Sequence, residues 1–262
     1  MPPAASTPTP PAVFNFEVPA AGGSMRAALA ASKAVNDTAD LAAVSGPWLV
    51  GSERERLARF VARAAGAEFL AGRMAAKAAL AALAPDLSPD RCEIVPGVWH
   101  QPTLRPHSHG LAITLTHGGG LGLALAADDR WLCGIDVEQT MRVERDIILP
   151  MVTPDERRWA DAAVDAGASR SRWSVLWTAR EALGKMLRCG IARPGVLLPL
   201  VDISESDGIW TARFDRADIR AHATCFAGLT FSLVAPALDG GDPPLRSALT
   251  WLRERLGRGP VQ

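Results

Sequence analysis

The chain has 262 residues, 48% of them hydrophobic, and its 28 basic residues balance its 28 acidic residues. This length and apolar content allow a large buried core, which excludes a disordered or fibrous protein. A net charge of zero provides no overall field to attract nucleic acid or an anionic membrane. We therefore expect neither as a partner, and any anion site must come from local clustering of basic residues.

Residues 1–24 are rich in proline, alanine, glycine and threonine without a periodic pattern. Such a composition buries too little surface to offset the entropy cost of ordering, so it predicts a disordered leader. The segment lacks the basic and apolar regions of a secretory signal, and no apolar run reaches the roughly 18 residues of a membrane span. Because the four cysteines also form no CxxC pair, we expect a soluble, cytoplasmic protein.

The next part of the chain predicts helices and then strands. Apolar residues at helical intervals between Glu53 and Leu83 indicate two helices interrupted near Gly66. Short apolar runs bounded by glycine, proline or aspartate follow, and they predict strands at residues 92–95, 111–117, 121–127 and 131–138.

The same order of elements is then repeated. Thr153, Pro154 and Glu156 form the pattern of a capped helix start, and a longer helix is expected at about 169–187. Strands are predicted at 196–204, 209–214, 222–228 and 229–235. Helices followed by strands, twice over, predict an α+β fold with an N-terminal half at 25–127 and a C-terminal half at 128–236.

Residues 237–262 contain a glycine- and proline-rich linker and then the pattern of a short amphipathic helix. Their composition and that of the leader predict little packing. We therefore expect both ends of the chain to be dispensable for chemistry.

Two carboxylates close the apolar run "GIDVE" at 134–138. In an extended segment Asp136 and Glu138 point to the same side, so they repel each other and raise each other's pKa unless a cation lies between them. A divalent metal would relieve that repulsion. Taken alone, the pair is more often a solvated strand edge.

The predicted helix at 169–187 adds a third carboxylate and a cation. Trp177, Glu181 and Lys185 follow one another at intervals of four residues and share one face. An ordinary surface ion pair is the alternative, but the apolar residues around them place this helix against a core. Near Asp136 and Glu138, these groups would make a Mg²⁺ site of hard oxygen ligands beside a phosphate-binding lysine.

These two stretches together resemble a known signature. "GIDVE" followed by "WTAREALGKM" is similar to the paired motif of the 4′-phosphopantetheinyl transferases, G-[IV]-D-[IV]-E and W-x-x-K-E-[AS]-x-x-K. "TPDERRW", "LTHGG" and "EFLAGRMAAKAAL" resemble further segments of the larger, Sfp-type members. The resemblance covers about residues 50–235. It implies a pseudo-twofold α+β fold of two similar halves, with the active site in the cleft between them.

The resemblance also implies a reaction. A serine hydroxyl of an apo acyl, peptidyl or aryl carrier protein would attack the β-phosphate of coenzyme A and release 3′,5′-ADP. Asp136, Glu138 and Glu181 would hold Mg²⁺, with Mn²⁺ as a substitute, and Lys185 would contact the transferred phosphate. The base that accepts the serine proton is either Glu181 or a metal-bound water. Two halves that form one cleft make a monomer sufficient.

The contacts to coenzyme A are implied in the same way. His117 stands where the family histidine contacts a phosphate, and Thr116 replaces the usual serine before it. Arg63, Arg73 and Lys77 would hold the nucleotide end, with solvated surface cations as the alternative. A further departure is Arg180, which stands where the family commonly has lysine.

Other functions stay open from the sequence. The same carboxylates would suit a Mg²⁺-dependent phosphohydrolase acting on a nucleotide pyrophosphate, and a carrier-binding homologue without activity is the non-enzymatic alternative. Histidines at 100, 107, 109 and 117 would suit a transition metal. Because their segment is proline-rich and lacks a carboxylate or thiolate partner, a polar loop is the better interpretation.

Overall fold

The structure is a computed structural model of the chain, and it describes residues 9–21, 23–35, 41–60, 62–106, 110–140, 145–163, 165–190, 198–215, 217–239 and 241–257. The chain divides into two compact units. The first comprises Met1–Asn15 and Arg26–Arg130, and the second Phe16–Met25 and Trp131–Gln262. The predicted boundary between residues 127 and 128 lies just before this division.

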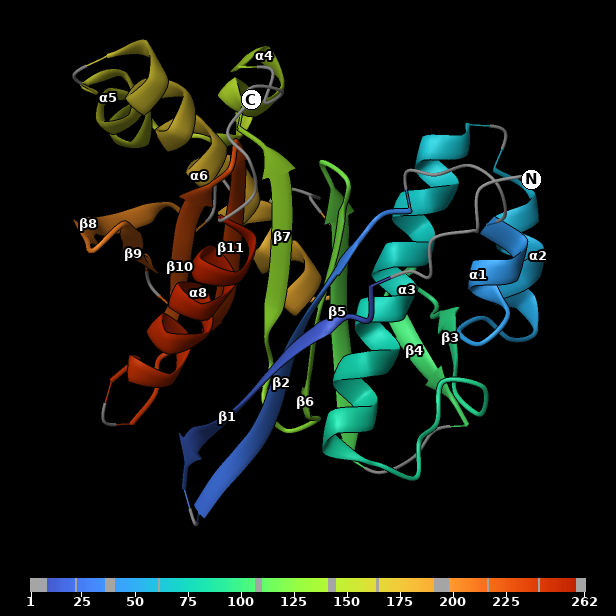
Figure 1. Cartoon of the computed structure of the whole chain (residues 1–262). Helices are drawn as coiled ribbons and strands as arrows, with labels where there is room; N and C mark the ends of the chain where they lie inside the picture. The colour runs from blue at the N-terminus through green and yellow to red at the C-terminus, as the bar shows by residue number, and fades with distance from the viewer. Residues whose placement is uncertain are drawn as a thin grey trace. The chain divides into compact units, whose positions relative to one another are not determined.

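The first unit contains a long helix and most of a four-stranded sheet, of which residues 16–25 belong to the second unit (Figure 1). The strand order is β1 (Ala12–Ala20), β2 (Gly23–Lys33), β6 (Leu121–Asp128), β5 (Leu111–Gly118). β6 pairs antiparallel with both of its neighbours, and helix α3 (Arg63–Leu83) packs on β6 and β5. The strands predicted at 111–117 and 121–127 are present.

The prediction of a disordered leader over 1–24 is wrong for most of that segment. Residues 12–20 and 23–33 form β1 and β2, whereas residues 1–8 lie outside the described part. The Ala27–Ala31 stretch of β2 is fully or almost fully buried and pairs with β6. Alanines give a weak hydrophobic signal, and their hydrogen-bonding partner lies about a hundred residues away, so local composition hides this strand.

The break between the two helices predicted at 53–83 lies before Arg63 and not near Gly66. Helix α1 (Leu41–Ser45) precedes α2 (Ser52–Ala58), and α3 begins at Arg63 and runs through Gly66 without interruption. A Cβ at Gly66 would lie 3.4 Å from the Leu57 side chain. The glycine therefore serves helix packing rather than helix termination.

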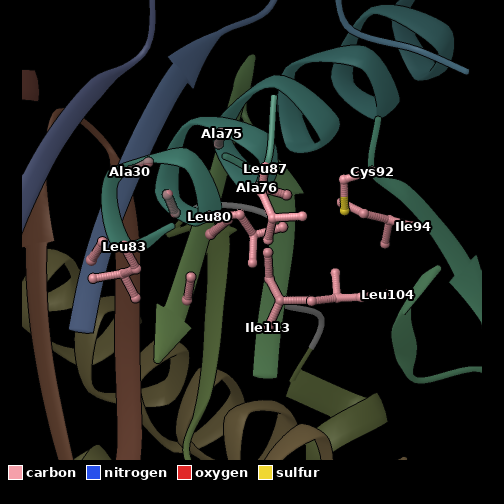
Figure 2. Packing of buried hydrophobic residues seen from close by; sticks show 14 of the residues in the cluster. Ala30, Ala75, Ala76, Leu80, Leu83, Leu87, Cys92, Ile94, Leu104 and Ile113 are labelled. Carbon is pink, nitrogen blue, oxygen red and sulfur yellow. The ribbon is translucent and has the colours of Figure 1, made fainter. Parts of the chain in front are cut away.

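The core of the first unit lies beneath the C-terminal half of α3. Leu80 and Leu83 pack with Ile113 of β5, and Ile94 and Leu104 close the cluster (Figure 2). The last two residues belong to a separate two-stranded sheet of β3 (Glu93–Pro96) and β4 (Pro102–Arg105). Burial of this aliphatic cluster stabilises the unit.

A five-stranded antiparallel sheet organises the second unit. The strand order is β7 (Gly134–Gln139), β11 (Leu229–Pro236), β10 (Ile219–Phe226), β9 (Ile209–Phe214), β8 (Leu200–Ser206). The strands predicted in this half are therefore present. Helix α6 (Ala166–Met186) packs on β7, β11 and β10.

Short helices connect β7 to α6. They are α4 (Arg145–Ile148), the 3-10 turn η1 (Leu149–Met151) and α5 (Pro154–Asp161). The predicted capping box is present at the start of α5, where Thr153 Oγ1 accepts from Glu156 N at 3.3 Å and Glu156 Oε2 accepts from Thr153 N at 2.7 Å. The two units thus have mixed α and β content, as predicted. In the described part of the chain, every helix is too short or too polar to cross a membrane.

The C-terminal helix α8 (Pro243–Leu256) packs against β10. Ala221 of β10 belongs to the core cluster beneath α6, whereas His222 lies 3.4 Å from Asp242 at the start of α8. Because alternate residues of a strand face opposite sides, α6 and α8 cover opposite faces of the sheet (Figure 1). The expectation that the tail packs little is wrong, since Leu245, Leu249 and Leu252 are buried.

We expect Leu249→Ala to lower the free energy of unfolding by about 2–5 kcal/mol, because the side chain is fully buried and leaves a cavity. Denaturant unfolding of the full chain measures this loss. Glu254→Ala, an exposed change on the same helix, is the control and should be nearly neutral. A Leu249→Ala protein as stable as the control would show that α8 does not contribute to the fold.

Candidate active site

Strand β7 carries the paired carboxylates. Ile135 and Val137 are fully buried, as the predicted alternation requires, while Glu138 is partly exposed. Asp136 is itself only 3% exposed. In the sheet Asp136 is opposite Ser232 and Glu138 is opposite Thr230 of β11. The carboxylates therefore belong to an ordered, mostly buried strand rather than to a solvated edge.

Helix α6 brings the lysine of the second motif onto this strand. Lys185 Nζ donates to Asp136 Oδ1 at 2.6 Å. Two residues that are 49 positions apart in the sequence thus form one ion pair. The lysine side chain is 31% exposed and the aspartate side chain 5%, so the pair lies where a buried strand meets solvent.

Glu181 lies close enough to Asp136, Glu138 and Lys185 to interact with their charges. Burial and the neighbouring charge of Asp136 raise the pKa of Glu181 to about 7; Glu138 adds to this and Lys185 opposes it. A carboxyl group is shifted in this direction when its ionised form is desolvated and faces like charges. The structure thus brings together Asp136, Glu138, Glu181 and Lys185.

Gly134, the first residue of "GIDVE", explains how the helix approaches so closely. A Cβ at this position would lie 2.7 Å from Met186 N and still closer to Ala182 O, nearer than real Cβ atoms approach other atoms. Only glycine lets β7 touch the α6 backbone here. Ala182 and Met186 directly follow Glu181 and Lys185 in sequence. This contact therefore fixes how closely both functional side chains approach β7.

The donor set fits a hard divalent cation in its chemistry, since it consists of three carboxylates, and Asp136 and Glu138 both raise the pKa of Glu181 in addition to the effect of burial. Among the described residues, however, no group of three or more His, Cys, Asp or Glu side chains is close enough to form a metal site. In this structure the ammonium group of Lys185 neutralises Asp136. The predicted metal ligands therefore share a site without forming a closed coordination shell.

The first unit holds the residues predicted to contact coenzyme A. Thr116 is buried on β5, and His117 at the end of that strand has 43% of its side chain exposed, with Nδ1 3.9 Å from Glu68 Oε2. Glu68 Oε1 also accepts from Gly120 N at 3.0 Å. Glu68 was not anticipated from the sequence, because on a helix surface a glutamate gives no specific signal.

Arg63 lies at the start of α3 and borders a pocket of about 680 Å³. Arg54 also lines this pocket, and Leu57 and Phe60 supply apolar walls. The exposed position of Arg63 leaves it accessible to an anionic ligand.

Arg73 and Lys77 occupy a different environment from the predicted one. Lys77 is 1% exposed, and its Nζ donates to Glu53 Oε2 at 2.6 Å and to Pro89 O at 2.9 Å. Arg73 Nε lies 3.2 Å from Glu53 Oε1. Burial lowers the pKa of Arg73 to about 10 and lowers that of Lys77, while Glu53 opposes both shifts. Neither cation is presented on the surface for a nucleotide.

Glu53 was missed because "SERERLARF" reads as a polar helix surface. The available signal was Lys77 itself, a charged residue among alanines on the apolar face of a helix. A cation in such a position needs a buried partner. Glu53 provides it and also accepts from Ile94 N at 3.2 Å, so it links α2, α3 and β3.

We expect Lys77→Ala to lower the free energy of unfolding by about 3–5 kcal/mol, because it leaves the Glu53 carboxylate buried without its closest cation. Thermal unfolding measures this. The triple variant Lys77→Met, Arg73→Met and Glu53→Gln removes all three buried charges, so it strands none and should recover part of the loss. If Lys77→Ala were as stable as the wild type and bound coenzyme A more weakly, Lys77 would be a nucleotide contact after all.

In EDTA, the stability of the protein should depend on the ionisation of Glu181. The pKa of its carboxyl is raised in the folded state from 4.5 to about 7, so the unfolded state releases the proton first and stability falls as pH rises between these values. Above pH 7 the folded wild type bears the full free-energy cost of an ionised Glu181. Glu181→Gln should therefore raise the melting temperature by about 2–4 °C at pH 8, after allowance for partial exposure.

At pH 4.5 the gain should vanish, because the wild-type carboxyl is then protonated in the folded protein. Glu254→Gln on α8 is the control and should show no such pH dependence. A Glu181→Gln protein with a pH-independent difference in melting temperature would contradict the placement of Glu181 beside Asp136.

The alternative transition-metal site involves His107 and His109, which lie outside the described residues.

A comparison with protein families finds a similarity over the segment that carries this site. Residues 132–229 match the sequence model of the 4′-phosphopantetheinyl transferase superfamily, which confirms the resemblance of this segment to the superfamily. The matched segment includes all of β7 and α6, and therefore Asp136, Glu138, Glu181 and Lys185. No curated protein matches the chain.

Proposed function

We propose that the protein transfers the 4′-phosphopantetheine group of coenzyme A to a serine hydroxyl of an apo carrier protein, releasing 3′,5′-ADP. The observation that carries this proposal is the contact of Lys185 with Asp136, with Glu181 in the same electrostatic site. These three residues lie within the segment that matches the transferase superfamily.

Lys185 is suited to bind the transferred phosphate. An ammonium group has three hydrogens to donate, and Asp136 Oδ1 uses one of them. Because the side chain is partly exposed, the others remain available for phosphate oxygens, where a positive charge stabilises the charge that develops during transfer.

Glu181 is suited to accept the proton of the attacking serine. A general base works best when its pKa is near the working pH, and the pKa of Glu181 is about 7. An ordinary exposed glutamate would be a much weaker base. Burial of Glu181 and repulsion from Asp136 give it this basicity when no cation is bound, and a water held by the cation is the other candidate for this step.

A divalent cation is part of the proposal. Asp136, Glu138 and Glu181 would hold Mg²⁺ or Mn²⁺, which when bound would neutralise charge on the pyrophosphate. His117, Thr116 and Arg63 would contact coenzyme A; Arg73 and Lys77 are left out because Glu53 pairs with both in the interior. Two similar halves with the active site between them, a monomeric state and a cytoplasmic location are expected for this function.

The test is incubation with Mg²⁺, coenzyme A and a panel of apo acyl, peptidyl and aryl carrier proteins, with 3′,5′-ADP measured by chromatography. The proposal expects 3′,5′-ADP to form only when a carrier is present. Release of nucleotide without a carrier would instead indicate a phosphohydrolase. Carrier binding without release, with every carrier in the panel, would indicate an inactive homologue.

A further inference from the structure

A buried ion pair lies next to Glu181 and takes no direct part in the proposed chemistry. Arg180 of α6 pairs with Glu156 of α5 at 2.5 Å, and the two side chains are 2% and 0% exposed. Buried ion pairs are costly to form and seldom add net stability compared with apolar residues of similar size. The contribution of this pair therefore lies in something other than net stability.

Arg180 donates hydrogen bonds from all three nitrogens of its guanidinium group. Nε donates to Met151 O at 2.9 Å, NH1 donates to Leu176 O at 3.1 Å, and NH2 donates to Glu156 Oε1. The planar arginine fork fixes direction as well as distance, which a single-point ammonium group does not. These contacts tie one side of α6 to the η1 turn and to α5.

Glu156 is held equally firmly. Its Oε1 also accepts from Leu200 N at 2.7 Å, and its Oε2 accepts from Thr153 N at 2.7 Å. The anchor for Arg180 is therefore joined both to the capped start of α5 and to the first residue of β8. Rotation of α6 about its axis would break this set of contacts.

Helix geometry relates these contacts of Arg180 to the positions of the active-site residues on the same helix. Successive residues are rotated by about 100°, so Glu181 and Lys185 lie between the side of the helix that carries Arg180 and the side that carries Ala182 and Met186. The first side is held by Glu156. The second side meets Gly134 of β7 in backbone contact. The two functional side chains are thus fixed from both flanks.

We propose that Arg180 and Glu156 are positioning residues: their buried ion pair sets the rotation of α6 that aims Glu181 and Lys185 at Asp136. This inference rests on the proposed transfer reaction for its catalytic consequence. Its structural consequence, a fixed α6, stands independently of that reaction.

The experiment compares three variants of the full chain. Arg180→Met with Glu156→Gln removes both charges, so no buried charge is stranded, and glutamine keeps an acceptor for Leu200 N. Arg180→Lys keeps the charge and loses the fork. Leu249→Ala on α8 is the matched control, because it destabilises the same unit from the opposite face of the sheet.

With saturating coenzyme A and carrier, well below each melting temperature, we expect the double variant to lose about 10–100-fold in kcat while KM for coenzyme A changes little. Arg180→Lys should recover part of kcat. Leu249→Ala should keep the wild-type kcat per folded molecule. A double variant with kcat within twofold of the wild type would overturn the proposal.

Amide hydrogen exchange provides a readout that does not depend on activity. The amides of 180–186 should exchange faster in the double variant than in the Leu249→Ala protein at equal stability. If the wild type shows no transfer at all, the proposed function fails and the exchange data alone decide on positioning. Unchanged exchange over 180–186 would overturn the positioning role whatever the activity.

Discussion

Gly134→Ala should lower both the stability of the second unit and the transfer activity. The added methyl would be forced against Ala182 O and would lie 2.7 Å from Met186 N. Both are backbone atoms of α6, so they cannot move aside as the end of a flexible side chain could. Overpacking of this kind costs about 1–3 kcal/mol or more, and here it pushes the helix that carries Glu181 and Lys185 away from Asp136.

We expect kcat to fall about 100-fold or more, since a shift of about 1 Å at reacting groups has effects of that size. Thermal unfolding and single-turnover transfer measure the two effects. Leu249→Ala is the matched control, because it destabilises the same unit from the opposite face of the sheet. It should leave the contact between Lys185 and Asp136 unchanged. A Gly134→Ala protein with wild-type stability and rate would show that the close approach of β7 and α6 is unimportant.

Asp136→Asn should lower the transfer rate by about 100–1000-fold, the range seen when one stabilising group of a preorganised site is lost. Asparagine has nearly the same shape, and its oxygen can still accept from Lys185. It lacks the charge that would hold a divalent cation and that helps to raise the pKa of Glu181.

The fold should survive this change. The variant loses the charge of an ion pair with a partly exposed lysine, but it also loses repulsion from Glu181, and these effects oppose each other. We therefore expect a melting temperature within about 3 °C of the wild type. Asp202→Asn, which alters an exposed ion pair with Arg213, is the control and should keep full activity. Unfolding of Asp136→Asn would make Asp136 a structural residue rather than a functional one.

The sequence was most informative where a short segment determines its own structure. The capping box of Thr153 and Glu156 is a local pattern and is present as predicted. The alternation in "GIDVE" correctly placed Ile135 and Val137 in the core. The intervals of α6 placed Glu181 and Lys185 on one side of that helix, and the motif spacing then suggested their meeting with β7.

It was least informative where partners lie far apart in the chain. β2 is a strand because β6 supplies its hydrogen bonds, and its alanines carry little signal of their own. Lys77 was predicted to hold the nucleotide end of coenzyme A or else to be a surface cation, since nothing near it in sequence reveals that Glu53 is its partner across 24 positions. In the same way, the need for glycine at 134 becomes visible only when α6 is packed against it.

The most direct test of the central claim is the intact mass of one apo carrier protein after incubation with coenzyme A and Mg²⁺. Parallel samples contain the wild type or the Asp136→Asn variant at equal concentration. The claim that Asp136, Glu181 and Lys185 form a phosphopantetheinyl transfer site predicts a phosphopantetheine adduct on the carrier serine with the wild type, and almost none with the variant at the same time. Equal rates of adduct formation with both proteins, or no adduct with the wild type on any carrier, would contradict it.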